Sequence, residues 1–277
     1  MKKKLLYYCL LLSCLFSGVE SAFATIRLVT TTELNDTDEG SLQYIWKNVA
    51  DQDTIMFDES LKDAVITGAT LATPRLADRY IAVIGNGVVL NLGLTINGGG
   101  YRLENLIVKG SLTSSNMDRP VYIKNCDFTT GGPLANVYHL TTFATLANKV
   151  VEVIVEGSSF TSKGKEATTR WGTAAGGDAN VNRLTVHFIS CTFESFQKVS
   201  NRSLLYLTSN TKGIKEITLT NCVLVNHQPG ASVISGFNSA TSYGYNVVKG
   251  TIDENVSWTA QETDIVDAEM NNPLVLH

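Results

Sequence analysis

The sequence predicts an all-β chain folded as a single-stranded right-handed parallel β-helix, a solenoid, with a short helix capping its N-terminal end. The first observation is a repeat that alternates apolar and polar residues and occurs four times, as VYIKNCDF (121–128), VIVEGSSF (153–160), VHFISCTF (186–193) and ITLTNCVL (217–224). The second is that the residues closing these copies lie 32, 33 and 31 positions apart. Recurrence at such a period is typical of a solenoid whose neighbouring coils bury a shared core. The third is an amphipathic helical pattern near the start of the chain.

Residues 1–24 have the pattern of a secretory signal peptide. Three lysines precede an apolar run from Leu5 to Phe16, and Ala22-Phe23-Ala24 supplies small residues for cleavage. We therefore expect cleavage after Ala24 and a mature domain at residues 25–277, outside the cell or on its surface. The apolar run is about half of the ~20 residues that span a bilayer, so no transmembrane segment is expected in the mature chain.

The same region permits a second interpretation. Leu11-Leu12-Ser13-Cys14 resembles a bacterial lipoprotein signal, in which Cys14 would carry the lipid. In that case the mature protein would be anchored to a membrane through its N-terminus.

Charge and cysteine content exclude other classes of protein. Cleavage after Ala24 removes three Lys and one Glu, which changes the net charge from −4 to about −6. This balance argues against a nucleic-acid partner, which needs a large basic surface. The remaining Cys126, Cys191 and Cys222 are odd in number and sit at equivalent repeat positions, so we expect buried small hydrophobic residues rather than disulfides or a metal site.

Residues 33–58 predict the cap. Asp36 to Gly40 have turn chemistry, and the apolar residues that follow are spaced as one stripe of a short helix beginning near Ser41. Residues 54–57 then read as a strand. Because a solenoid exposes an apolar cross-section at each end, an amphipathic helix is suited to covering it. The stripe consists of Leu42, Ile45, Trp46 and Val49.

Coil length and alternation predict the rest of the architecture. Val88, Val108 and Phe128 are 20 apart, near the minimum for three short strands and three turns, and later coils are longer because of outer loops. Alternation in residues 121–128 places Val121 and Ile123 inward and the residues between them outward.

The N-terminal segment, the coils and the C-terminal segment each resemble known families. NDTDEGSLQYIW followed by DQDTIMFD is similar to the entry segment of surface-displayed β-helix proteins, including the polymorphic outer-membrane protein family. The coils resemble the wider pectate-lyase-like superfamily, and residues 245–277 resemble its last coil. The resemblance implies a fold that hosts lyases, hydrolases, adhesins and binding modules. It also leads us to expect further residues after NNPLVLH that close this coil.

Carboxylate rows would indicate a lyase or a hydrolase. A polysaccharide lyase needs a base and usually a Ca²⁺ ion held by carboxylates, whereas a hydrolase needs paired carboxylates. The row expected for Asp127 continues as Ser159, Thr192 and Val223, and the row of Lys124 continues as Glu156, Ile189 and Thr220. No carboxylate cluster is predicted, so no metal or cofactor is expected, and Ca²⁺ would be needed only by a lyase.

Two corner loops carry the predicted ligand site. Residues 161–170 and 194–203 hold five cations against two glutamates. Counting from the closing phenylalanines places His139 and Trp171 in one row, with Tyr206 two positions along in the next coil. Cations beside aromatic faces suit a shallow site for an acidic glycan. The candidate ligand-binding residues are Lys163, Lys165, Arg170, Trp171, Lys198, Arg202, His139 and Tyr206.

These observations favour a secreted or cell-surface binding or adhesion module whose partner is a polysaccharide or a cell-surface glycan. The alternative is a polysaccharide lyase acting on an acidic polysaccharide. A third possibility is that the chain is one part of a larger surface protein. The missing carboxylate cluster argues against the lyase, and an assay for cleaved product would separate it from the binding module.

Overall fold

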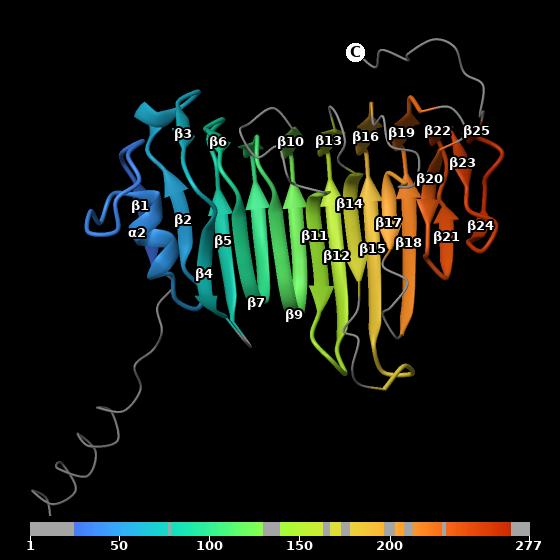
Figure 1. The fold of residues 1–277 in the computed structure, drawn as a ribbon, viewed down its shortest axis with the longest axis horizontal. Helices are drawn as coiled ribbons and strands as arrows, with labels where there is room; N and C mark the ends of the chain where they lie inside the picture. Colours follow the sequence, from blue (N-terminus) through green and yellow to red (C-terminus); the bar gives the residue numbers. More distant parts are fainter. Residues whose placement is uncertain are drawn as a thin grey trace, which may run out of the picture.

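A computed structural model describes residues 25–76, 79–129, 139–162, 167–172, 178–196, 203–207, 213–228 and 231–266. The strands pair in parallel, coil after coil, and form the elongated body seen in Figure 1. This arrangement confirms the predicted parallel β-helix. The predicted signal peptide and the closing NNPLVLH lie outside the described residues.

Each coil contributes strands to three sheets. Two long strands, β7 and β9, pass through the corner between the first two sheets and belong to both. Sheet I contains β4 (Leu71–Arg75), β7 (Leu94–Glu104), β9 (Leu112–Lys124), β11 (His139–Thr145), β14 (Ala167–Gly172), β17 (Leu205–Leu207), β20 (Ser232–Ser235) and β23 (Thr251–Ile252). Sheet II contains β1 (Ile26–Val29), β2 (Thr54–Phe57), β5 (Tyr80–Ile84), β7, β9, β12 (Val150–Glu156), β15 (Arg183–Ile189), β18 (Ile214–Thr220), β21 (Ser239–Ser242) and β24 (Ser257–Thr259). Sheet III contains β3 (Val65–Thr67), β6 (Val89–Asn91), β8 (Ile107–Val108), β10 (Asp127–Thr129), β13 (Ser159–Ser162), β16 (Thr192–Ser195), β19 (Val223–Asn226), β22 (Val247–Lys249) and β25 (Ile265–Val266).

The core is built from rows of residues that pair across neighbouring coils. In sheet II, alternate residues face inward and are buried, as the alternation predicts. The two inward rows are Val121, Val153, Val186, Ile217 and Ile123, Val155, Phe188, Leu219. In sheet III the row of closing residues is Phe128, Phe160, Phe193, Leu224. The first three rings stack, with centroids 4.9 and 4.8 Å apart.

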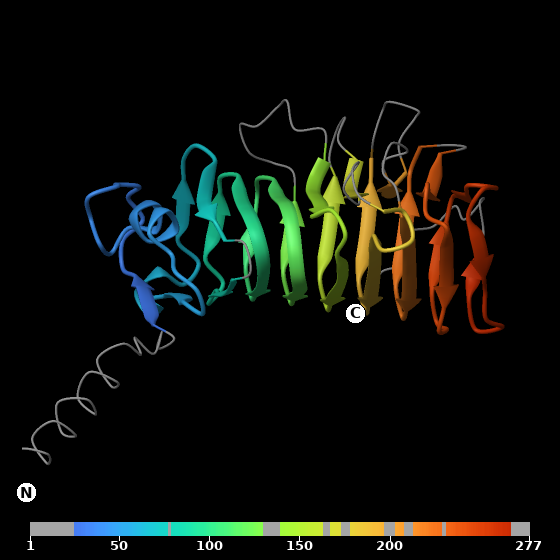
Figure 2. The ribbon, with the colours of Figure 1, turned by 90° about the horizontal axis from the view of Figure 1, so that it is seen from below.

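The N-terminal end of the solenoid is covered by α2 (Leu42–Lys47), which Figure 2 shows at that end of the body. Ser41 begins the helix by accepting a hydrogen bond from the backbone N–H of Gln43. The predicted apolar stripe is buried, and the indole N–H of Trp46 donates to the carbonyl oxygen of Thr95 at 3.3 Å. The predicted helix and the strand at 54–57 are both confirmed. A single 3₁₀ turn, η1 (Glu59–Leu61), follows β2.

The three cysteines are free and buried in the predicted inward row. The thiol of Cys191 donates to the carbonyl oxygen of Val155 at 3.3 Å, and that of Cys222 donates to Phe188 at 3.4 Å. Burial raises the pKa of the Cys126 thiol to about 12. Such thiols act as small core side chains rather than as nucleophiles.

One turn recurs at the corner between sheets II and III. Its central residue has a positive φ in six successive coils, and in the first five of them its backbone N–H donates to a carbonyl oxygen of the next coil. Asn221 donates from its side-chain amide to the hydroxyl oxygen of Ser190 at 3.1 Å, and this bond stabilises the turn. The residues at this position are Asn105, Asn125, Gly157, Ser190, Asn221 and Tyr245.

Candidate functional site

Most of the predicted corner-loop site falls on residues that the structure does not describe. Lys163, Lys165, Lys198 and Arg202 lie outside the described residues, as does the side chain of His139. Their role in ligand binding therefore stays a prediction.

Trp171 corrects the expected position of the aromatic contact. It is fully buried on the inner side of β14, its ring stacks on Phe143 with centroids 4.2 Å apart, and it meets Phe188 edge-on. Its indole N–H donates to the hydroxyl oxygen of Thr169 at 3.0 Å. A ring enclosed in this way offers no face to a ligand at the surface.

The expected aromatic row is also corrected. His139 pairs with Ala167 rather than with Trp171, because the segments between sheet III and sheet I differ in length from coil to coil. Arg170 pairs directly with Tyr206 on the neighbouring strand, and both side chains are half-buried. Of the predicted site residues, this is the pair that the structure places in one row.

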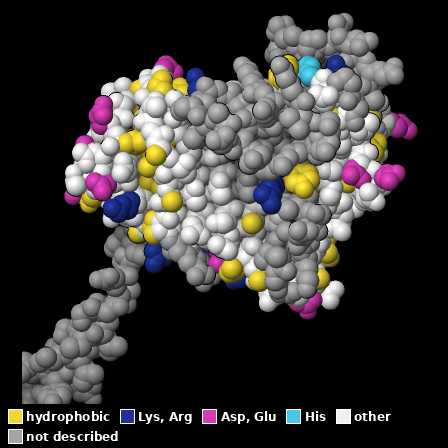
Figure 3. All heavy atoms as spheres, viewed as in Figure 1, with side chains coloured by type: hydrophobic (Ala, Val, Ile, Leu, Met, Phe, Trp, Pro, Cys, Tyr) yellow, Lys and Arg dark blue, Asp and Glu magenta, His cyan; other side chains and the backbone are white. Residues whose placement is uncertain are grey.

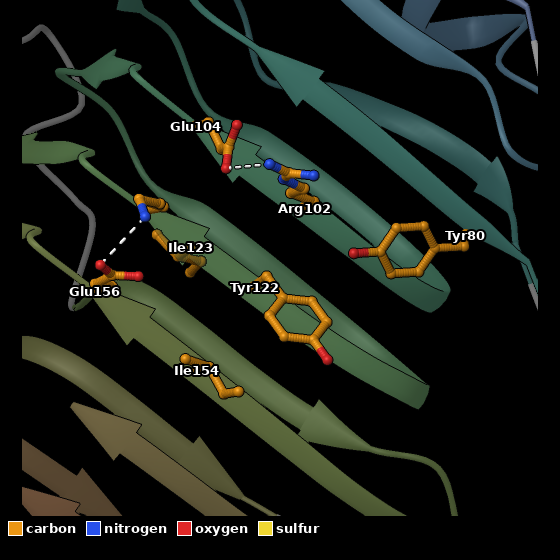
Figure 4. Close-up of a pocket in the computed structure, with 8 residues that line it drawn as sticks. Tyr80, Arg102, Glu104, Tyr122, Ile123, Ile154 and Glu156 are labelled. Carbon is orange, nitrogen blue, oxygen red and sulfur yellow. Dashed lines mark hydrogen bonds and ion pairs between the residues drawn. The ribbon is translucent and has the colours of Figure 1, made fainter. Parts of the chain in front are cut away.

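A hollow of about 330 Å³ lies on the outer face of sheet II, over strands β5, β7, β9 and β12 (Figure 4). Sheet register brings its residues together from distant parts of the chain. Arg102, Tyr122 and Ile154 form one outward row. The adjacent outward row is Glu104, Lys124, Glu156.

Two tyrosines supply the aromatic surface of the hollow. Tyr122 is 39% exposed. In Figure 4 the flat faces of the Tyr122 and Tyr80 rings are turned toward the viewer. Tyr80 pairs with Gly100, where a Cβ atom would lie 3.1 Å from the Tyr80 ring and 2.4 Å from the carbonyl oxygen of Pro120. The absence of a side chain at Gly100 thus leaves the space that the Tyr80 ring occupies.

The charges around the hollow neutralise one another. The guanidinium of Arg102 contacts the carboxylate of Glu104 at 2.6 Å, and the Lys124 ammonium contacts Glu156 at 3.2 Å. The second pair joins Lys124 to the next residue of its predicted row. On the face seen in Figure 3, the Lys and Arg side chains of the described residues appear as separate spots and not as one basic patch.

The Tyr80 hydroxyl remains protonated at neutral pH. Burial, with a smaller contribution from neighbouring Tyr122, raises the pKa of Tyr80 to about 12. It can therefore donate a hydrogen bond to a ligand, but it is a poor base for removing a proton.

His187 continues the row of Ile154 in the next coil and faces outward. Its Nε2 lies 3.2 Å from the Glu152 carboxylate, and its Nδ1 lies 2.8 Å from the Thr218 hydroxyl. Both ring nitrogens thus have partners, which fixes the orientation of the ring.

Sequence reasoning assigned Tyr122 to the outer face but missed its association with Tyr80 and Arg102. Arg102 belongs to the short coils and Ile154 to the long ones, so a single repeat spacing does not align them. The usable signal was the alternation of outward residues within each strand, followed from coil to coil.

Within the described ranges, no group of three or more His, Cys, Asp or Glu residues is arranged to hold a metal ion. No helix in this part of the chain has the length and apolar character needed to cross a bilayer. The hollow combines aromatic faces, hydroxyls and paired charges on the outer face of a sheet.

No family model matches this chain, and neither a curated protein nor a solved structure shows significant similarity to it.

Proposed function

We propose that the protein is an exported binding module that holds a glycan chain in the hollow of Tyr80, Arg102 and Tyr122. The observation that carries the proposal is the pair of tyrosine rings lying on the outer face of sheet II beside two ion pairs. Aromatic faces accept the apolar faces of sugar rings, while charged groups form strong hydrogen bonds to hydroxyls. A shallow, polar site of this kind suits a sugar chain better than a compact apolar ligand.

The charge balance of the hollow favours a neutral glycan. Arg102 and Lys124 each have a carboxylate partner, so neither cation is available to attract an acidic sugar. The acidic glycan expected from the corner loops would need the separate site predicted there.

The hollow supports binding rather than chemistry. Its phenol at Tyr80 is held in the protonated form, and the carboxylates of Glu104 and Glu156 are engaged by cations. Export follows from residues 1–24, whose pattern is that of a signal peptide. N-terminal sequencing of the secreted protein should begin at Thr25.

Binding can be measured by isothermal titration with soluble linear β-glucan, xylan and mannan and with an acidic polymer, polygalacturonate. We expect Tyr122→Ala to weaken binding of the best neutral polymer about tenfold, which corresponds to about 1.4 kcal/mol. Phe196→Ala is the matched control, because Phe196 is a comparably exposed aromatic residue (43%) just after sheet III strand β16.

Unchanged affinity in Tyr122→Ala would contradict the proposal. Release of unsaturated sugar products from polygalacturonate would instead favour a lyase. Product release should therefore be followed by ultraviolet absorbance in the same samples.

A further inference from the structure

Two more tyrosines project from the corner between sheets II and III, after β21. Tyr243 is 65% exposed and Tyr245 is 69% exposed, whereas Ser242, Gly244 and Asn246 between and beside them are buried. Alternation thus directs both rings away from the core. Exposed aromatic residues placed side by side are typical of an interaction site.

Tyr245 has a left-handed backbone conformation, which asparagine and glycine adopt more readily than tyrosine. Its φ is +61°, and the equivalent turns of earlier coils have Asn, Ser or Gly at this position. A bulky side chain is disfavoured in the left-handed region, which asparagine and glycine tolerate. Because the ring is mostly exposed, core packing does not compensate. Strain retained without a packing gain indicates a functional role.

The turn that carries these tyrosines is one residue longer than the previous one. Leu219 pairs with Ser242 and Val223 pairs with Val247, so residues 220–222 are matched by residues 243–246. The extra residue makes room for two outward side chains on one turn.

Buried hydrogen bonds hold this turn in place. The side-chain oxygen of Asn246 accepts from the backbone N–H of Cys222 at 2.8 Å, and its amide donates to the Asp264 carboxylate at 3.1 Å. Asp264 also accepts from the Ser242 hydroxyl at 2.9 Å. The tyrosines are therefore carried on a fixed support.

The turn that carries Tyr243 and Tyr245 lies at the same edge of sheet II as the rim of the hollow. Thr220 belongs to the row that begins with Glu104 and Lys124, and Tyr243 comes directly after Ser242, which pairs with the residue before Thr220. Lys124 on β9 and Tyr243 are separated by four coil steps, or ~19 Å at the spacing of parallel strands. Figure 1 shows the intervening strands β12, β15 and β18 side by side along the body. Between the two ends, the outward residues Ile154, His187 and Thr218 are half-buried, and Ile189 is exposed.

We propose that Tyr243 and Tyr245 form a second aromatic contact for the glycan chain, which lies parallel to the solenoid axis between the hollow and this corner. The inference rests on the proposed function, because the hollow supplies the first contact. A chain long enough to reach both contacts gains affinity from the second, since that contact forms within the complex at a high effective concentration. A short oligosaccharide reaches only one.

The test uses Tyr245→Asn, which places at this turn the residue found at Asn125 and Asn221. We expect a higher melting temperature, because the strain is relieved, together with about tenfold weaker binding of the polymer. The probes are soluble β-glucan, xylan and mannan, each as polymer and as trisaccharide. Trisaccharide binding should be unchanged. Tyr243→Ser is the matched variant, which removes a ring without relieving strain and should weaken polymer binding without raising the melting temperature.

The outcomes separate this inference from the function on which it rests. If Tyr122→Ala weakens both probes while Tyr245→Asn and Tyr243→Ser leave polymer affinity unchanged, the second contact is wrong and the hollow stands. Wild-type protein that binds none of the probes would contradict the proposed function and this inference with it.

Discussion

The indole of Trp171 lies parallel to the ring of Phe143, with centroids 4.2 Å and planes 4° apart. Phe143 in turn faces Tyr101 at 6.4 Å, so aromatic rings from β7, β11 and β14 form one stack inside the solenoid. Because each ring rests on the next, the stack ties sheet I of one coil to that of its neighbour.

Trp171→Ala should therefore destabilise the protein rather than affect a surface site. Truncation leaves a large cavity in the core, and we expect a loss of about 3–5 kcal/mol in the free energy of unfolding. Denaturant titration followed by circular dichroism measures it. Tyr122→Ala is the control and should cost less than about 1 kcal/mol, since its ring is partly exposed. A similar small loss in Trp171→Ala would show that this ring is not part of the core.

The cysteines should react only when the protein unfolds. Burial raises the pKa of Cys126 to about 12 and that of Cys191 as well, so neither thiol forms appreciable thiolate at neutral pH. The hydrogen bond with Cys191 lowers the pKa of Cys222, but this side chain has no exposed surface, so a reagent cannot reach it. Iodoacetamide followed by mass spectrometry should label none of Cys126, Cys191 and Cys222 in the native mature protein and all three in denaturant. A mass two units lower, from a bridge between Cys191 and Cys222, would contradict the free thiols.

The sequence predicted the solenoid because inward rows repeat in spite of unequal coil lengths. Phe128, Phe160 and Phe193 stack as their spacing indicated, and Ser41 begins the capping helix as expected. The candidate site was harder to predict. Trp171 was placed by counting from Phe160, and such a count fails where a corner loop lies between the anchor and the strand.

Residues of the hollow escaped prediction for a different reason. Tyr80 and Tyr122 are separated by strand β7, where Gly100 has no side chain, and a glycine gives no sequence signal for the ring that covers it. The left-handed conformation of Tyr245 is likewise visible only in the backbone, because its neighbours in sequence do not show which turn position it fills.

Asp264 should make the C-terminal coil sensitive to acid. Partial burial alone would raise the pKa of its carboxyl, but hydrogen bonds from Gln261, Ser242 and Asn246 outweigh burial and hold the pKa below 3.8. A depressed pKa means that the unfolded state binds more protons. The stabilisation is thus complete above the ordinary carboxyl pKa and is lost as the pH falls through the folded value.

Hydrogen exchange at pH 3 and pH 6 would detect this change. We expect the amides of Asn246 and Gln261 to lose protection at the lower pH, and Asp264→Asn to show reduced protection at both. Asp36→Asn is the control, since Asp36 forms an exposed ion pair with Lys47 far from this coil. Equal protection of both amides in wild type and Asp264→Asn would rule out the anchoring role.

Salt should distinguish the hollow from the predicted corner-loop site. The cations of the hollow, Arg102 and Lys124, are already paired, so its affinity for a neutral glycan should change little between 50 and 500 mM NaCl. An acidic polysaccharide held by the corner loops should instead bind more weakly as salt rises, because exposed charges are screened over ~8–10 Å at physiological ionic strength. Isothermal titration with β-glucan and with polygalacturonate measures both. Changing Lys163, Lys165 and Lys198 together to Ser should weaken only the polygalacturonate. If that triple variant weakened the neutral glycan equally, the ligand would cross the loops and the hollow would not be the principal site.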